Sequence, residues 1–67
     1  MRQVHSYTAI DIAETGGAVV DEFVAVNPAA AVRRAQFAAE GVILQLWSSG
    51  KLVGAWRRVG PRTFLPA

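Results

Sequence analysis

A single helix signal near the middle of the 67-residue chain constrains the fold more than any other feature. Asn27 is a favoured N-cap residue, Pro28 is a favoured first helical residue, and the alanine-rich segment that follows has a strong helix propensity as far as Gly41. We therefore expect a helix over residues 28–40. Because one helix of about three turns covers only one face of a sheet, a sheet in this chain keeps its other face uncovered.

Two pairs of strand-like segments flank this helix. Residues 4–12 and 18–26 are rich in β-branched and aromatic side chains and are separated by a turn that contains two glycines. Residues 42–47 and 52–59 form a second apolar pair, joined by a short serine–glycine turn. The sequence therefore predicts an α+β fold, in which a four-stranded antiparallel sheet of order ββαββ carries one helix packed on one face.

The chain is long enough for one domain only, and its length is near the lower limit for folding without disulfides or metals. We expect residues 1–67 to form a single small domain, with residues 60–67 as an extended C-terminal tail. Prolines bound this tail and disfavour a helix there. Its Phe64 and Leu65 are apolar enough to pack back as a short edge segment.

The strands carry apolar residues on both faces, which is more than one helix can cover. In residues 18–26, Val20 and Val24 have one parity and Val19 and Phe23 have the other. The later strands repeat this pattern. We therefore expect the uncovered sheet face to associate with a partner or with a second copy of the chain.

The residue inventory argues against catalysis and against bound cofactors. There is no cysteine, and one histidine does not make a metal site by itself. The two adjacent glycines lack the lysine and hydroxyl residue of a phosphate loop. The titratable or nucleophilic candidates form no catalytic signature: His5, Ser6, Tyr7, Asp11, Asp21 and Glu22. Of these, His5, Tyr7 and Asp11 share one face of a predicted strand.

Charge and hydropathy indicate a cytoplasmic protein with one basic half. No apolar run approaches the roughly 20 residues of a membrane span, and the N-terminus lacks the apolar stretch of a signal peptide. Residues 1–27 hold one arginine against four carboxylates, whereas residues 28–67 hold six lysines and arginines against one carboxylate. The basic half is suited to phosphate or to an acidic protein surface.

The expected helix carries an aromatic residue on its polar side. At about 100° per residue, the apolar stripe contains Ala31, Val32, Ala35, Ala38 and Ala39. Phe37 lies on the opposite side with Arg33, so we expect it to face water, and we interpret it as the first candidate for a binding surface. The alternative is that Phe37 is one of the single exposed apolar residues common on protein surfaces.

A second candidate recognition segment is Trp56-Arg57-Arg58, in which a stackable ring stands beside two guanidinium groups. The alternatives are a core tryptophan followed by solubilising charges, or an aromatic pair of Trp47 and Trp56 across the hairpin. The predicted partner-binding residues are Arg33, Arg34, Phe37, Trp56, Arg57 and Arg58.

Two family resemblances follow from these features. Tyr7-Thr8-Ala9-Ile10-Asp11, followed by Gly17, Val24, Ala31, Arg34 and Gly41, resembles the start of the cytoplasmic domain of type II secretion and type IV pilus platform proteins, over about half of the chain. The whole chain is similar to small phage-encoded anti-CRISPR proteins, notably a group that acts on type I-F systems. This second resemblance comprises the size, the ββαββ order, Tyr7, the helix after Asn27-Pro28, and Ser49-Gly50-Lys51-Leu52-Val53 before a basic end.

The anti-CRISPR resemblance implies a non-enzymatic inhibitor that binds a CRISPR effector subunit and blocks its contact with guide or target nucleic acid. We expect this function for the chain. Two alternatives stay open: a small basic nucleic-acid-binding accessory protein, and a structural module that dimerises through its uncovered sheet face.

Overall fold

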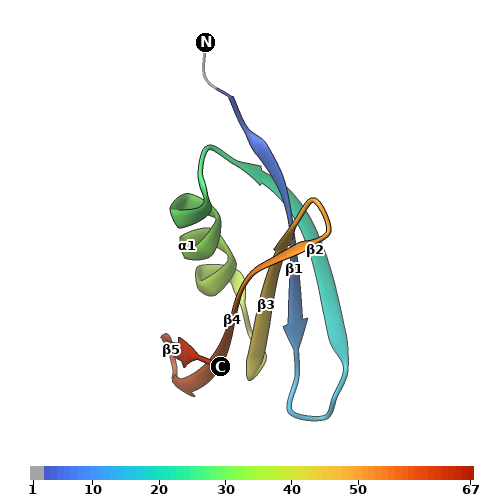
Figure 1. Cartoon of the computed structure of the whole chain (residues 1–67). Coiled ribbons are helices and arrows are strands. Elements are labelled where there is room, and N and C mark those ends of the chain that lie inside the picture. Colours follow the sequence, from blue (N-terminus) through green and yellow to red (C-terminus); the bar gives the residue numbers. More distant parts are fainter. Residues whose placement is uncertain (1–2) are drawn as a thin grey trace.

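Five antiparallel strands form one sheet in the order β2-β1-β3-β4-β5 in the computed structural model, which describes residues 3–67 (Figure 1). One helix lies against one face of this sheet. The elements in chain order are β1 (His5–Ile12), β2 (Ala18–Ala25), α1 (Pro28–Ala38), β3 (Ile43–Ser48), β4 (Lys51–Gly60) and β5 (Thr63–Pro66).

The predicted α+β class is confirmed, but the predicted number of four strands is wrong. The C-terminal segment turns at Pro61 and returns as β5, which pairs Leu65 with Arg57 and Phe64 with Arg58. Pro66 is tolerated there because β5 is an edge strand and has one side without a strand partner. The pairing extends the sheet by one strand.

Positive backbone φ angles shape both predicted hairpin turns. Gly16 has a φ of 94° in the turn between β1 and β2. Ser49 and Gly50 have φ angles of 52° and 76°, so both central residues of the β3–β4 turn are left-handed. That combination matches a two-residue turn whose twist suits an antiparallel hairpin.

The helix begins as predicted and ends two residues early. The Asn27 side chain accepts a hydrogen bond of 2.8 Å from the Ala30 backbone N–H, and Pro28 occupies the first turn. The last helical residue is Ala38. Gly41 was predicted to end the helix, but the structure requires glycine there because of close packing. A Cβ at this position would lie 2.6 Å from Asp11 Oδ1 and closer still to the Ile12 carbonyl oxygen.

The core lies between α1 and the sheet face toward it. Its buried sheet residues come from β1, β2 and β3, and only alanines of the helix are fully buried against them. This small helix surface lets the helix backbone lie close to the sheet. The buried core residues are Tyr7, Ala9, Phe23, Ala31, Ala35, Leu44 and Leu46.

One residue of the predicted apolar helix stripe, Ala38, does not face the core. Val32 and Ala39 are half-buried and pack against the core, as expected for the stripe. Ala38 is exposed, because it lines an open groove between α1 and β2 instead of lying over the sheet.

The other sheet face carries no helix in residues 3–67 (Figure 1). It remains largely apolar, as expected, and includes Val20 and Val24 at 58% and 53% exposed and Leu52 at 50% exposed. Trp47 lies on this open face, whereas Trp56 pairs with buried Leu44 on the helix side. The two tryptophans are therefore on opposite faces, and the aromatic pair considered from the sequence does not form.

Candidate functional site

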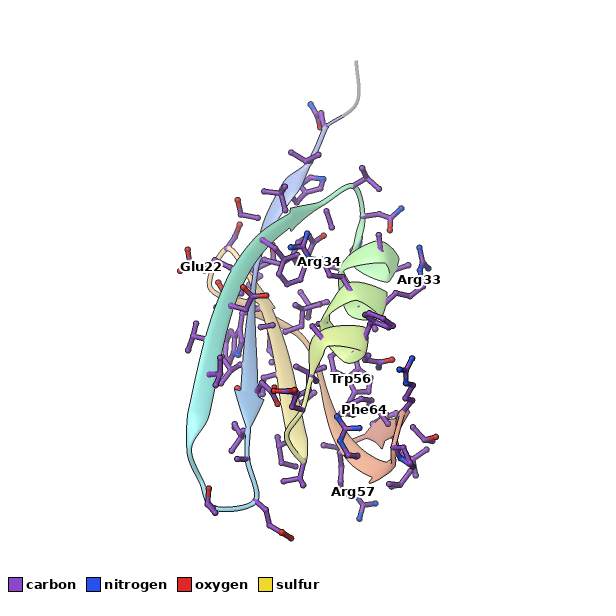
Figure 2. The ribbon with its side chains drawn as sticks, turned by 180° about the vertical axis from the view of Figure 1, so that it is seen from behind. Glu22, Arg33, Arg34, Trp56, Arg57 and Phe64 are labelled. Atoms are coloured by element: carbon purple, nitrogen blue, oxygen red, sulfur yellow. The ribbon has the colours of Figure 1, made fainter. Side chains whose placement is uncertain are left out.

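The outer side of α1 presents an aromatic ring between two arginines. Phe37 is 78% exposed, and the guanidinium carbon of Arg62 lies 5.4 Å from the centre of its ring. Arg33 is exposed one helical turn earlier and, in Figure 2, projects away from the sheet. A shallow hollow is lined by Arg33, Gln36, Phe37 and Arg62, which we call the helix patch.

The position of the helix patch follows from the packing on the other side of the helix. Ala31 and Ala35 are buried against the sheet, so the residues on the opposite side of α1 point outward. Arg62 comes from the turn between β4 and β5, which lies near the C-terminal end of the helix (Figure 1). The patch therefore joins two segments that are far apart in the sequence.

Arg34, the neighbour of Arg33, has a different environment. Its guanidinium carbon lies 4.6 Å from the centre of the Phe23 ring, and Phe23 in turn stacks on Tyr7 with ring centres 6.0 Å apart. Arg34 is exposed, but it extends over the edge of the core between α1 and β2 (Figure 2). This stacking stabilises the core edge and leaves the outer side of the guanidinium open to solvent.

Arg58 binds backbone carbonyl groups within the chain. Its Nε donates to the Gly41 carbonyl at 2.7 Å, and its second terminal nitrogen donates to the Ala39 carbonyl at 2.7 Å. The first terminal nitrogen donates to the carbonyls of Gly60 and Pro61. The same guanidinium lies 4.7 Å from the centre of the Phe64 ring. Arg58 thus ties the segment after α1 to the β4–β5 turn.

Trp56 and Arg57 point to opposite faces of β4. The Trp56 ring is half-buried on the helix side and packs against the core, where Gly54 leaves room for it. A Cβ at Gly54 would lie 2.6 Å from the indole ring. Arg57 is exposed and pairs with Ile43 on the open face (Figure 2).

The six residues predicted to bind a partner therefore do not form one surface. Arg33 and Phe37 share the outer side of α1, and Arg34 lies on its flank. Trp56 and Arg58 are engaged inside the fold, and Arg57 is on the far face. The residue that completes the helix patch, Arg62, has no local sequence signal, because its position depends on how the C-terminal segment folds back.

A groove of about 230 Å³ between α1 and β2 gathers three carboxylates, from Asp11, Asp21 and Glu40. The two Asp11 oxygens accept hydrogen bonds of 2.8 Å from the backbone N–H groups of Glu40 and Gly41. Among residues 3–67, no cluster of three or more ligating side chains is placed to hold a metal ion. Asp11 therefore has a structural role at the end of the helix.

The strand face shared by His5, Tyr7 and Asp11 is the inner face of the sheet. Tyr7 is 3% exposed in the core, and Asp11 is hydrogen-bonded as described, so neither is free in an open polar cluster. Across the described residues, no helix has the length and apolar character that crossing a bilayer requires.

Comparison with protein-family models found no match to this chain. Comparisons with curated proteins and with solved structures likewise found no match.

Proposed function

We propose that this chain is a non-catalytic binding protein and that the helix patch is its contact surface for a protein partner. The observation that carries the proposal is the 78% exposure of Phe37 between Arg33 and the stacked Arg62. Aromatic and arginine side chains are enriched at protein interfaces, because the rings supply a large apolar area and the guanidinium groups supply charged hydrogen-bond donors.

The patch is well suited to binding because little of it has to be ordered on contact. The helix that carries Arg33 and Phe37 is capped at Asn27 and packed through buried alanines. The stacking of Arg62 on the ring restricts both side chains before a partner arrives. A fitting partner surface has an apolar pocket for the ring and carboxylates at its rim for the two guanidinium groups.

The specific form that we propose is an inhibitor of the anti-CRISPR kind, which acts in the cytoplasm and blocks a nucleic-acid-handling effector complex. The resemblance in size and in the order of the first five elements, β1 to β4 with α1, motivates this choice. The distribution of basic residues supports a protein contact over direct nucleic-acid binding. Arg57 and the helix patch lie on different sides of the sheet, and Arg58 is used internally, so the arginines within residues 3–67 form no continuous track for a phosphate backbone.

The test measures target-DNA binding by a purified type I-F CRISPR effector complex with and without the protein. The wild-type chain is expected to inhibit binding, and Phe37→Ala and Arg33→Glu are each expected to weaken inhibition by at least about tenfold, as hot-spot substitutions do. Lys51→Glu is the matched control, because it makes the same charge reversal at the first residue of β4, away from the patch. Circular dichroism verifies the fold of each variant.

Two results would overturn the proposal. Inhibition that is unchanged in both patch variants would remove the helix patch as the contact surface. A wild-type chain that leaves the effector active but binds random DNA, with an affinity that falls steeply with salt, would favour the nucleic-acid-binding alternative.

A further inference from the structure

We propose that the open sheet face is a homodimer interface, in which two copies pack face to face with their strands nearly perpendicular. This inference concerns the side of the sheet away from the helix patch and does not depend on the proposed function. The face is formed by alternate residues of β1 to β4. Most of these are aliphatic, among them Ile10, Ile12, Val20, Val24, Ile43 and Leu52, and its neutral polar members are Ser6, Thr8 and Gln45.

One pair of polar side chains on the open face is hydrogen-bonded within the chain. The indole nitrogen of Trp47 donates a 3.1 Å hydrogen bond to Gln45 Oε1 on the same face, so each partly satisfies the other. Two charged residues remain among the paired positions, Glu22 on β2 and Arg57 on β4. They have opposite sign, and both are exposed (Figure 2). A contact that pairs them avoids the cost of burying either charge alone.

The strand register places these two charges at opposite corners of a nearly square area. A row here is a line of directly paired residues that crosses the sheet from β2 to β4. One row runs from Glu22 on β2, through Thr8 and Trp47, to Leu52 on β4. Another row runs from Ala18 on β2, through Ile12 and Ile43, to Arg57 on β4. The two corners are three strand spacings apart across the sheet, about 14 Å, and four residues apart along it, about 13 Å. The other two corners are Leu52 and Ala18.

The arrangement of corners selects one relative orientation of the two copies. In a face-to-face dimer the two-fold axis lies in the plane between the two sheets. An axis parallel to the strands brings Glu22 of one copy over Leu52 of the other, and an axis perpendicular to the strands brings it over Ala18. Both arrangements leave the charges against apolar side chains. A two-fold axis along the diagonal from Leu52 to Ala18 exchanges the other two corners. It brings Glu22 of each copy over Arg57 of its partner, and the strands then cross at about 90°, which is one of the two common modes of sheet packing.

The area of the face predicts a weak dimer. Four strands by about five residues cover roughly 300 Å² of flat area per copy. Because side chains project from the sheet, the solvent-accessible area is larger than the flat area and approaches roughly 600 Å² per copy. That value is the upper limit of small, transient interfaces. We therefore expect a dimer that dissociates in about the micromolar range, so its presence depends on protein concentration.

The experiment is sedimentation equilibrium over a range of concentrations, with charge-reversed variants of the two corners. Glu22→Arg and Arg57→Glu each create two like-charge contacts per dimer and are expected to raise the dissociation constant at least about tenfold. The double variant E22R/R57E restores both pairs and is expected to dimerise like wild type. An equimolar mixture of the two single variants is expected to form a heterodimer, because both contacts then join opposite charges.

Two further measurements complete the test. Arg33→Glu reverses a charge on the helix patch and is expected to leave the dissociation constant unchanged. Dimerisation is also expected to shift tryptophan emission to shorter wavelength, because Trp47 lies on the open face whereas Trp56 lies on the other side.

Several outcomes would overturn the inference. One is a wild-type chain that stays monomeric at concentrations up to about 1 mM, the upper end of weak dissociation constants. This outcome includes a monomer whose open face binds lipid vesicles or another protein instead. A second is a pair of single variants that dimerise as well as wild type. A third is the absence of recovery in both the double variant and the mixture.

Discussion

At the scale of single residues, two adjacent arginines have opposite roles. Arg58 donates to four backbone carbonyls, whereas Arg57 is exposed on the open face. The sequence Trp56-Arg57-Arg58 is typical of a recognition segment, and nothing in it distinguishes one arginine from the other. The difference arises from strand alternation combined with the position of the segment after α1, which local sequence does not reveal.

Arg58→Ala is expected to destabilise the protein by about 3 kcal/mol, because it leaves partly buried carbonyl groups without their charged donor. Arg58→Lys is expected to recover less than half of that loss, since an ammonium group cannot reproduce the planar set of donors. Arg57→Ala is the matched control and is expected to change stability by less than about 0.5 kcal/mol. Urea denaturation at low protein concentration, where the chain is monomeric, measures all three. Equal losses for Arg57→Ala and Arg58→Ala would contradict this assignment.

Gly41→Ala is expected to cost about 2 kcal/mol, because the added methyl group meets backbone and carboxylate atoms that are already hydrogen-bonded. Gly17→Ala is the control. Its added methyl group would have no neighbour closer than 4.0 Å, and its φ is not in the left-handed region. It is expected to be neutral or slightly stabilising. Thermal unfolding followed by circular dichroism compares the two, and similar melting temperatures would show that the segment around Gly41 can relax.

At the scale of elements, the helix was predictable because its start has a strong local chemical signal. Asn27 and Pro28 mark the first turn, and the spacing of the alanines at the helical period indicates the buried side. The end of the helix was less predictable, because Gly41 serves close packing against β1. The C-terminal segment was predicted as a tail whose Phe64 and Leu65 can pack back as a short edge segment, and the structure has an edge strand there, β5. It was not counted as a strand of the sheet because prolines bound it.

Ala35→Gln is expected to destabilise the protein by several kcal/mol, in the range of core substitutions that overpack and bury an unpaired polar group. Ala35 is 3% exposed beneath the helix. Ala38→Gln makes the same change one turn later at an exposed position and is expected to cost less than about 0.5 kcal/mol. Chemical denaturation measures the difference. A fully stable Ala35→Gln variant would show that the helix can move away from the sheet.

At the scale of the whole molecule, the strand order is the feature that the sequence did not reveal. Local signals identify hairpins, but nothing local shows that β1 pairs with β3 as well as with β2. The helix patch was only half predictable for the same reason. Arg33 and Phe37 follow from helical periodicity, whereas Arg62 reaches the patch through the pairing of β4 with β5.

Hydrogen exchange of backbone amides tests this strand order. Strands β1, β3 and β4 have partners on both sides, so their amides are expected to exchange slowest, roughly a hundredfold more slowly than those of edge strand β5. The measurement is made by mass spectrometry of peptide fragments, at a protein concentration where the chain is monomeric. Faster exchange in β3 than in β5 would be incompatible with the observed order.

The position of β1 between β2 and β3 also determines when the chain can fold as it is synthesised. The β1–β2 hairpin emerges first, but its inner residues Tyr7 and Phe23 have nothing to cover them until α1 and β3 follow. Arg58 then has to arrive before the segment after the helix is tied down. Nearly the whole domain must therefore leave the ribosome before a stable core exists. A nascent chain of which only about the first 40 residues have left the ribosome will expose an apolar hairpin that chaperones can bind.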